Sequence, residues 1–187
     1  MPGKGELMLS GSLGDVIQES AKLAFSWVRA NSSLLGVSNE SVDVESKKWD
    51  LHIHVPGGAV PKDGPSAGVA LLVSIVSLLL NKSVPSDIGM TGEISLRGLV
   101  LPVGGIKEKL IAAHRAGLKT VILPDRNHRD IDWEVPRAVK EELDIQYAIT
   151  IWDVLQICFP DKNFMRKLNV WKERHGVTAQ DTFTSHL

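Results

Sequence analysis

The chain has 187 residues, 43% of them hydrophobic, and its 21 Lys and Arg nearly balance its 22 Asp and Glu, for a net charge of −1. This length predicts one ordinary domain with a short appendage, and without a block of like charge there is no electrostatic case for nucleic acid binding. The single cysteine, Cys158, excludes a disulfide within the chain and favours a reducing intracellular compartment. Its apolar neighbours indicate a small buried side chain. The longest apolar stretch, residues 69–80, is shorter than the roughly 20 residues of a membrane span.

The first half of the chain predicts two helices with a strand between them. Apolar residues recur near helical spacing over 14–30, which predicts an amphipathic helix that breaks at residues 31–33. Residues 51–55 alternate at period two and predict a strand. Pro65 then opens a helix that runs to about residue 80, because proline suits the first helical turn.

The second half predicts strands and helices in mixed order. The expected elements are two strands within 88–103 around a turn at 96–98, a helix at 106–116 ended by Gly117, a strand at 120–123, a helix at 135–143, a strand at 145–149 and a helix at 152–158. This order favours an α+β class, a mixed α/β sheet with packed helices. We divide the chain into a domain at 1–160 and a polar tail at 161–187 that we expect to be poorly ordered.

Ser66 is the first candidate for chemistry. It follows a loop that contains Asp63 and Gly64, and it lies at the expected start of a helix, where free N–H groups and the positive end of the helix dipole gather. Such a place stabilises developing negative charge, as an oxyanion hole must. The alternative is that Ser66 caps the helix, which is the commoner role of a serine in this setting.

A serine hydroxyl becomes nucleophilic when a base removes its proton. No histidine has a sequence context that singles it out as this base. We expect His52 and His54 to point to opposite faces of their strand, so that at most one of them faces the site.

Lysine is the other possible base. Lys107 and Lys109 lie two residues apart on a helix, which separates them by about 200°. Lys109 shares the apolar side of that helix and Lys107 looks outward. Burial can lower the pKa of a lysine from about 10.4, so Lys109 is the lysine that can lose its proton. The alternative is an amine that reaches the surface.

Two further polar residues accompany these candidates. Thr91 lies in an otherwise apolar strand, where its hydroxyl could orient an amine without charging it. The alternative is a β-branched residue in an ordinary strand position. Asp63 could tune or block the site, or it could be a turn residue that bonds its own backbone.

Four motifs in chain order resemble the proteolytic domains of Lon proteases, over about residues 5–160. They are GSLGDVIQES at 11–20, HIHVP at 52–56 with PKDGPSAG at 61–68, MTGEISLRG at 90–98, and LPVGGIKEKL at 101–110. Four long motifs in the right order are highly specific.

The resemblance implies a serine endopeptidase with a Ser–Lys dyad, in which Ser66 is the nucleophile and Lys109 the general base. The family threonine that contacts the lysine falls on Thr91, and the aspartate before the serine falls on Asp63. His52 and His54 match a histidine pair next to the site, and Gly64 belongs to the serine motif. The implied fold is similar to the ribosomal protein S5 domain 2-like fold.

The family also implies partners outside these residues. Lon proteases are hexamers that unfold proteins with an ATPase module and feed them to this domain. The chain has no G-x-x-x-x-G-K-[ST] phosphate loop, so we expect ATP and Mg²⁺ to bind upstream and this chain to hold no cofactor or metal. The expected partners are unfolded or damaged protein substrates and further copies in a homo-hexamer.

The sequence ends in Ser185-His186-Leu187, which resembles the peroxisomal Ser-Lys-Leu address. We therefore expect a peroxisomal import receptor as partner and the peroxisomal matrix as location. The alternatives are an ordinary polar tail and the mitochondrial matrix.

Two other functions stay open at this point. The turn around Ser66 could cradle phosphate, as in small-molecule kinases of the galactokinase–homoserine kinase type, although no acidic cluster in the sequence is typical of a Mg²⁺ site. The chain could also be a non-catalytic assembly module.

Overall fold

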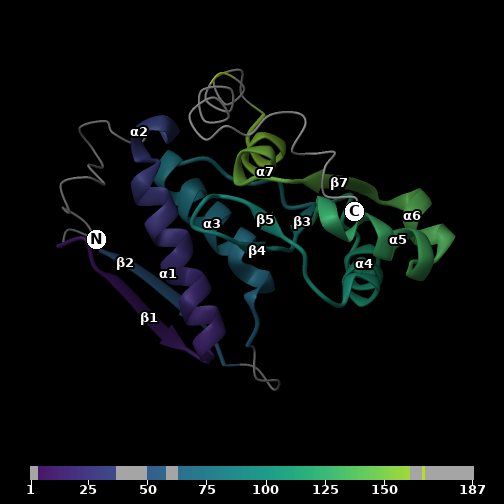
Figure 1. Ribbon diagram of the computed structural model, residues 1–187, viewed down its shortest axis with the longest axis horizontal. Helices are drawn as coiled ribbons and strands as arrows, with labels where there is room; N and C mark the ends of the chain where they lie inside the picture. The colour runs from purple at the N-terminus through teal and green to yellow at the C-terminus, as the bar shows by residue number, and fades with distance from the viewer. Residues whose placement is uncertain (1–3, 37–49, 58–62, 161–165, 167–187) are drawn as a thin grey trace.

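The computed structural model describes residues 4–36, 50–57, 63–160 and 166 (Figure 1). Helices and strands succeed one another without strict alternation. In chain order they are β1 (Leu7–Gly11), α1 (Asp15–Ala30), α2 (Ser32–Leu35), β2 (Leu51–Val55), the 3₁₀ turn η1 (Pro65–Ala67), α3 (Gly68–Leu80), β3 (Ile88–Met90), β4 (Glu93–Ile94), β5 (Val100–Leu101), α4 (Ile106–Arg115), β6 (Thr120–Pro124), the 3₁₀ turn η2 (Asp125–Asn127), α5 (His128–Glu134), α6 (Arg137–Glu142), β7 (Asp144–Ala148) and α7 (Ile151–Cys158).

The described strands form three small sheets. β1 pairs with β2 in parallel, β3, β6 and β7 form a parallel sheet with β6 in the middle, and β4 and β5 form an antiparallel hairpin. Parallel and antiparallel pairs thus occur together with packed helices, which confirms the mixed α/β architecture that the sequence predicted.

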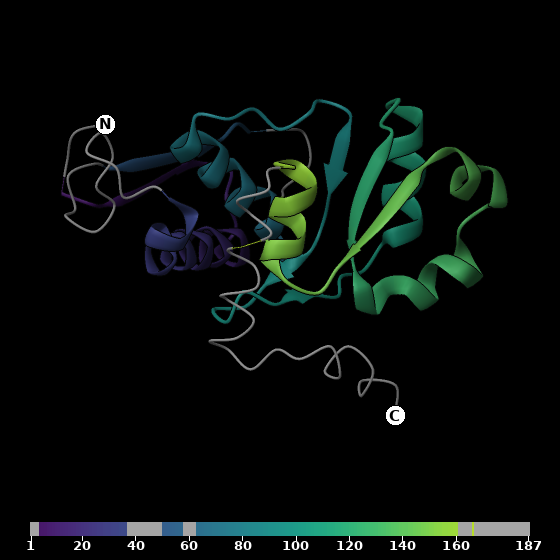
Figure 2. The same ribbon diagram turned by 90° about the horizontal axis from the view of Figure 1, so that it is seen from above.

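The central strand β6 separates two hydrophobic clusters. Ile122 belongs to the cluster built mainly by α1, α3 and α7, whereas Val121 and Leu123 belong to the cluster built by α4, α5 and α6. Successive side chains of a strand point to opposite faces, so one short strand serves both clusters. Figure 2 shows the consequence, with α7 on one side of the sheet and α4, α5 and α6 on the other.

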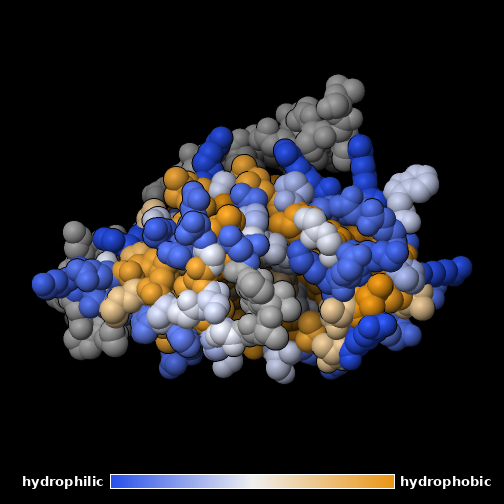
Figure 3. Space-filling view, turned by 90° about the horizontal axis from the view of Figure 1, so that it is seen from below, coloured by the Kyte–Doolittle hydropathy of each residue, from blue (hydrophilic) through white to orange (hydrophobic). Residues whose placement is uncertain are grey.

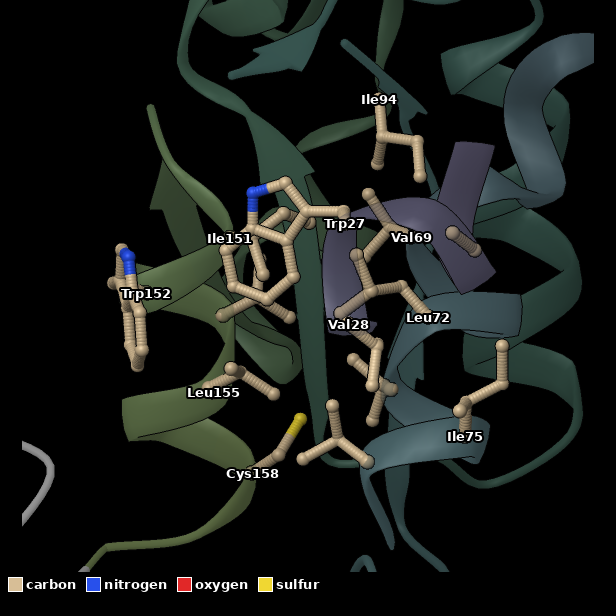
Figure 4. Packing of buried hydrophobic residues seen from close by; sticks show 14 of the residues in the cluster. Trp27, Val28, Val69, Leu72, Ile75, Ile94, Ile151, Trp152, Leu155 and Cys158 are labelled. Carbon is tan, nitrogen blue, oxygen red and sulfur yellow. The ribbon is translucent and has the colours of Figure 1, made fainter. Parts of the chain in front are cut away.

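The larger cluster is organised around two tryptophans (Figure 4). The rings of Trp27 on α1 and Trp152 on α7 meet edge to face, with centroids 5.4 Å apart. Leu72 of α3 packs into the same cluster, fully buried. Cys158 is buried there as the sequence predicted, and burial raises the pKa of its thiol to about 12, so this thiol is held in its inert protonated form.

Most elements lie where the local pattern predicted them. The helices expected at 14–30, 106–116 and 152–158 are α1, α4 and α7, and the strands expected at 51–55, 120–123 and 145–149 are β2, β6 and β7. Gly117 follows α4 with a φ of +75°, the left-handed conformation that ends a helix.

Other predictions were wrong in part. The segment 88–103 holds three strands instead of two, because β3 leaves the hairpin and pairs with β6. The helix expected at 135–143 is shorter, and α5 precedes it, with Pro136 between the two helices. The helix expected from Pro65 begins with a 3₁₀ turn.

The sequence analysis also missed a strand, β1. Its five residues lack clear alternation, and they become a strand through pairing with β2, with Leu7 opposite Leu51. The tail at 161–187 lies outside the described residues apart from Arg166, so its expected poor order stays a prediction.

The described surface mixes polar and apolar side chains, as Figure 3 shows for one face. Leu78, Leu96 and Trp133 are large apolar residues that stay exposed. No helix in the described ranges is both long and apolar enough to cross a membrane.

Helix α3 offers a matched test of this core. Leu72 is 0% exposed and Leu78 is 65% exposed on the same helix. Leu72→Ala should lower the free energy of unfolding by about 2–5 kcal/mol, because it removes buried contacts and leaves a cavity. Leu78→Ala should change it by no more than about 0.5 kcal/mol. Urea denaturation of both variants measures the difference, and equal losses would contradict the described packing.

Candidate active site

Ser66 lies in the turn η1, directly before α3, and its side chain is partly buried. Its carbonyl oxygen accepts two hydrogen bonds, from Thr91 Oγ1 at 3.2 Å and from the Gly92 amide at 3.0 Å. Both donors directly follow β3. These bonds hold the serine turn against the carboxyl end of that strand.

The hydroxyl of Ser66 is not used as a helix cap. In the part of the chain that the structure describes, no side chain caps η1 or α3, and the residue that precedes α3 is Ala67. Within the described residues, Ser66 therefore does not take the capping role that the sequence left open for it.

Lys109 and Lys107 occupy different sides of α4. Lys107 is exposed, whereas Lys109 is partly buried beside the buried residues Ile106 and Leu110. Desolvation lowers the pKa of the Lys109 amine below its ordinary value of 10.5, since burial penalises the charged form. This confirms the separation of the two lysines that the helical spacing predicted.

The Lys109 amine has one described partner. Its Nζ donates to the carbonyl oxygen of Gly104 at 2.8 Å. Gly104 lies just before α4. Among the hydrogen bonds of the described residues, none joins Ser66 Oγ to Lys109 Nζ.

Asn127 holds the segment that leads into α4. It is buried, with 3% of its surface exposed, and it lies just beyond β6. Its Oδ1 accepts from the Val103 amide at 3.0 Å, and its Nδ2 donates to the Val103 carbonyl at 2.9 Å and to Asp130 Oδ2 at 2.6 Å. The sequence analysis missed this residue. The signal that points to it is a polar residue just after a buried strand.

The serine turn and the lysine helix are thus held at the same edge of one sheet. Thr91 and Gly92 follow β3, Asn127 lies just beyond β6, and the two strands are parallel neighbours. Carboxyl ends of parallel strands share an edge, and in open α/β sheets that edge is the usual place for ligands.

The supporting residues take positions that the sequence did not specify. The Thr91 hydroxyl donates to the Ser66 backbone, and Thr91 is 7% exposed. Asp63 reaches back to α1, where its Oδ1 accepts from the amides of Val16 at 3.0 Å and Ile17 at 3.3 Å. Gly64 lies between Asp63 and η1 in an extended conformation.

The histidine pair faces a common partner. His52 Nε2 and His54 Nδ1 each lie 2.8 Å from Ser10 Oγ, and both rings are exposed. The expectation that they point to opposite faces was wrong, because residues two positions apart in a strand share a face. The pair lies on β2, the strand that leads toward the serine motif.

The described residues hold no group of three or more His, Cys, Asp or Glu side chains arranged around a common point for a metal ion. The candidate groups at this edge are the hydroxyl of Ser66, the amine of Lys109 and the backbone groups around Ser66. This set of groups suits acyl transfer through a serine nucleophile.

Comparison with known proteins decides the family. Residues 1–161 match the model of the Lon protease (S16) C-terminal proteolytic domain. The chain belongs to this family. It is therefore a Lon serine protease domain, as its four motifs predicted.

Curated relatives agree over most of the chain. The chain is 52% identical to a Lon protease of Anaeromyxobacter dehalogenans over 94% of its length, and 55% identical to the peroxisomal Lon protease homolog 2 of Arabidopsis thaliana over 85%. It is also 50% identical to the peroxisomal Lon protease homolog 2 of Danio rerio over 90% of its length. These alignments cover 18–20% of each relative, so the Lon domain spans about a fifth of the relatives' length.

Asn127 provides a test of how the Lys109 helix is held in this Lon domain. Asn127→Ala should lower the free energy of unfolding by about 1–3 kcal/mol, because it leaves the amide and carbonyl of the partly buried Val103 without these hydrogen bonds. Asp130→Ala serves as the control, since it removes one bond of Asn127 and keeps both bonds to Val103. Chemical denaturation should rank the two losses in that order, and the reverse order would contradict this role of Asn127.

Proposed function

We propose that this domain cleaves peptide bonds with Ser66 as nucleophile and Lys109 as general base. The observation that carries the proposal is a lysine whose pKa is lowered by burial, on a helix held at the same sheet edge as a serine that caps no helix. A lysine with a lowered pKa can accept the serine proton without a histidine.

The reaction begins when neutral Lys109 accepts the proton of Ser66 Oγ. The oxygen then attacks the substrate carbonyl carbon, and backbone N–H groups near the start of α3 stabilise the oxyanion. Pro65 contributes no N–H donor. The protonated Lys109 gives its proton to the leaving amine, and water, deprotonated by the same lysine, releases the acyl group from Ser66.

The remaining motif residues support this pair in our proposal. Thr91 fixes the backbone of Ser66, and Asp63 and Gly64 shape the segment before it. His52 and His54 stiffen the end of β2 through their shared contact with Ser10. The domain then comprises residues 1–160, with 161–187 as a tail, and its fold is of the ribosomal protein S5 domain 2-like type.

We further propose that the domain works inside an ATP-dependent protease. The relatives carry the name Lon protease and are about five times as long as the matched region. ATP and Mg²⁺ then bind in an ATPase module outside these residues. The whole protein forms a homo-hexamer, and its substrates are unfolded or damaged proteins.

Replacement of the dyad tests the proposed chemistry. Ser66→Ala and Lys109→Ala should each abolish both peptide hydrolysis and covalent labelling by a fluorophosphonate, because one removes the nucleophile and the other its base. Ser74→Ala and Lys107→Ala are matched controls, since Ser74 is an exposed serine of α3 and Lys107 an exposed lysine of α4. Both controls should keep wild-type rates, and full activity of Lys109→Ala would refute the dyad.

The pH dependence is set by the lowered pKa of Lys109. At low pH the amine is protonated and accepts no proton. kcat/KM should therefore rise as the pH increases through the pKa of Lys109, which lies below the ordinary lysine value of 10.5. Lys109→Arg should be inactive at every pH, because a guanidinium stays charged. Lys107→Arg should leave the profile unchanged. An active Lys109→Arg enzyme with the wild-type profile would exclude Lys109 as the base.

The location of the protein is proposed from its relatives and its last residues. Relatives from maize, Arabidopsis and Danio carry the name peroxisomal, although bacterial relatives are equally similar, and Ser185-His186-Leu187 fits a peroxisomal address. A fluorescent protein that ends in residues 161–187 should enter peroxisomes, and deletion of Leu187 should leave it in the cytosol. If the fusion with intact residues 161–187 stays in the cytosol, the peroxisomal address is refuted.

A further inference from the structure

The first turn of α1 is capped by a residue far away in the sequence. Asp63 Oδ1 accepts hydrogen bonds from the Val16 and Ile17 amides, and it lies 47 positions from Val16. Gly14, the residue at the N-cap position, has no side chain that could do this. The positive end of the helix dipole adds to the attraction for a carboxylate.

Gly14 leaves the space that this contact needs. A Cβ atom at position 14 would lie 2.5 Å from both carboxylate oxygens of Asp63, and closer still to its Cγ. Real Cβ contacts are essentially never that short, so the Asp63 side chain would have to move. Any residue other than glycine at position 14 therefore displaces the cap.

The contact reaches the reactive serine through the backbone. Asp63 lies three residues before Ser66, and the Ser66 carbonyl is bonded on its other side to Thr91 and Gly92. The serine turn is thus held between α1 and the end of β3. We propose that Asp63 is a positioning residue that acts through the N-terminus of α1, and that Gly14 is required because it makes room for the carboxylate.

This inference rests on the proposed role of Ser66 as nucleophile. It adds that the Asp63–α1 contact positions the turn that carries Ser66. The carboxylate acts as a hydrogen-bond acceptor for α1 and not as a proton carrier. An amide oxygen can take the same bonds, so Asp63→Asn should preserve the function and Asp63→Ala should lose it.

The test compares single variants and a double variant of the full chain. Asp63→Ala and Gly14→Ala should each slow fluorophosphonate labelling of Ser66 and lower kcat by at least about tenfold, with little change in KM, since they break one contact from its two sides. The double variant should be no slower than the slower single variant, because the shared contact is lost only once. Asp63→Asn should stay within about threefold of wild type.

Hydrogen exchange supplies a readout that does not depend on activity. The Val16 and Ile17 amides should exchange faster in Asp63→Ala and Gly14→Ala than in wild type and in Asp63→Asn. Asp153→Ala is the matched control, because Asp153 and Thr150 cap α7 in a similar way far from the serine motif in sequence. It should lower thermal stability yet leave labelling of Ser66 unchanged.

The outcomes separate this inference from the proposed function. If wild-type protein is labelled no better than Ser66→Ala, the proposed function fails, while the exchange experiment still decides whether Asp63 caps α1. If wild type is labelled and folded Asp63→Ala or Gly14→Ala reacts at the same rate, the positioning role is refuted. Additive losses in the double variant, or a loss in Asp63→Asn as large as in Asp63→Ala, would also overturn it.

Discussion

Parallel pairing of β3 with β6 is the constraint on which the arrangement of the site depends, because it brings the ends of both strands to one edge. Thr91, directly after β3, bonds the backbone of Ser66, and Asn127, just beyond β6, bonds Val103 ahead of the Lys109 helix. A sheet buried on both faces keeps that edge in place, since helices cover it from each side. The segments that carry Ser66 and Lys109 are therefore placed relative to one another by the pairing of these two strands.

The burial of Lys109 is a compromise between two demands. Complete burial of an amine would make its charged form very unfavourable, whereas full exposure would leave its pKa near that of a free lysine. The side chain lies between these limits beside Ile106 and Leu110, and its Nζ keeps a backbone partner in Gly104. Desolvation thus favours the neutral form of the amine, and the amine keeps its hydrogen bond to the backbone.

Long-range bonds to single side chains recur around the site. Asp63 caps α1, which begins 48 residues earlier at Asp15. Asn127 bonds Val103, which lies 24 residues before it in the sequence. Each bond links a segment close in sequence to Ser66 or Lys109 to another part of the chain. Such bonds cost little when the partner is already ordered, because less conformational entropy is lost.

The sequence by itself determined most of the longer helices and the main strands, and it named the two candidate residues Ser66 and Lys109. Periodicity is local, so it identified α1 and α4, and helical spacing alone separated Lys109 from Lys107. Other features depended on partners that no local pattern names. β1 is a strand because of its pairing with β2. Asp63 is a cap because α1 begins beside it, and buried Asn127 is satisfied because Val103 lies within hydrogen-bond distance. Residues far apart in sequence meet only when the chain packs, so the tertiary structure alone decided which polar groups they satisfy.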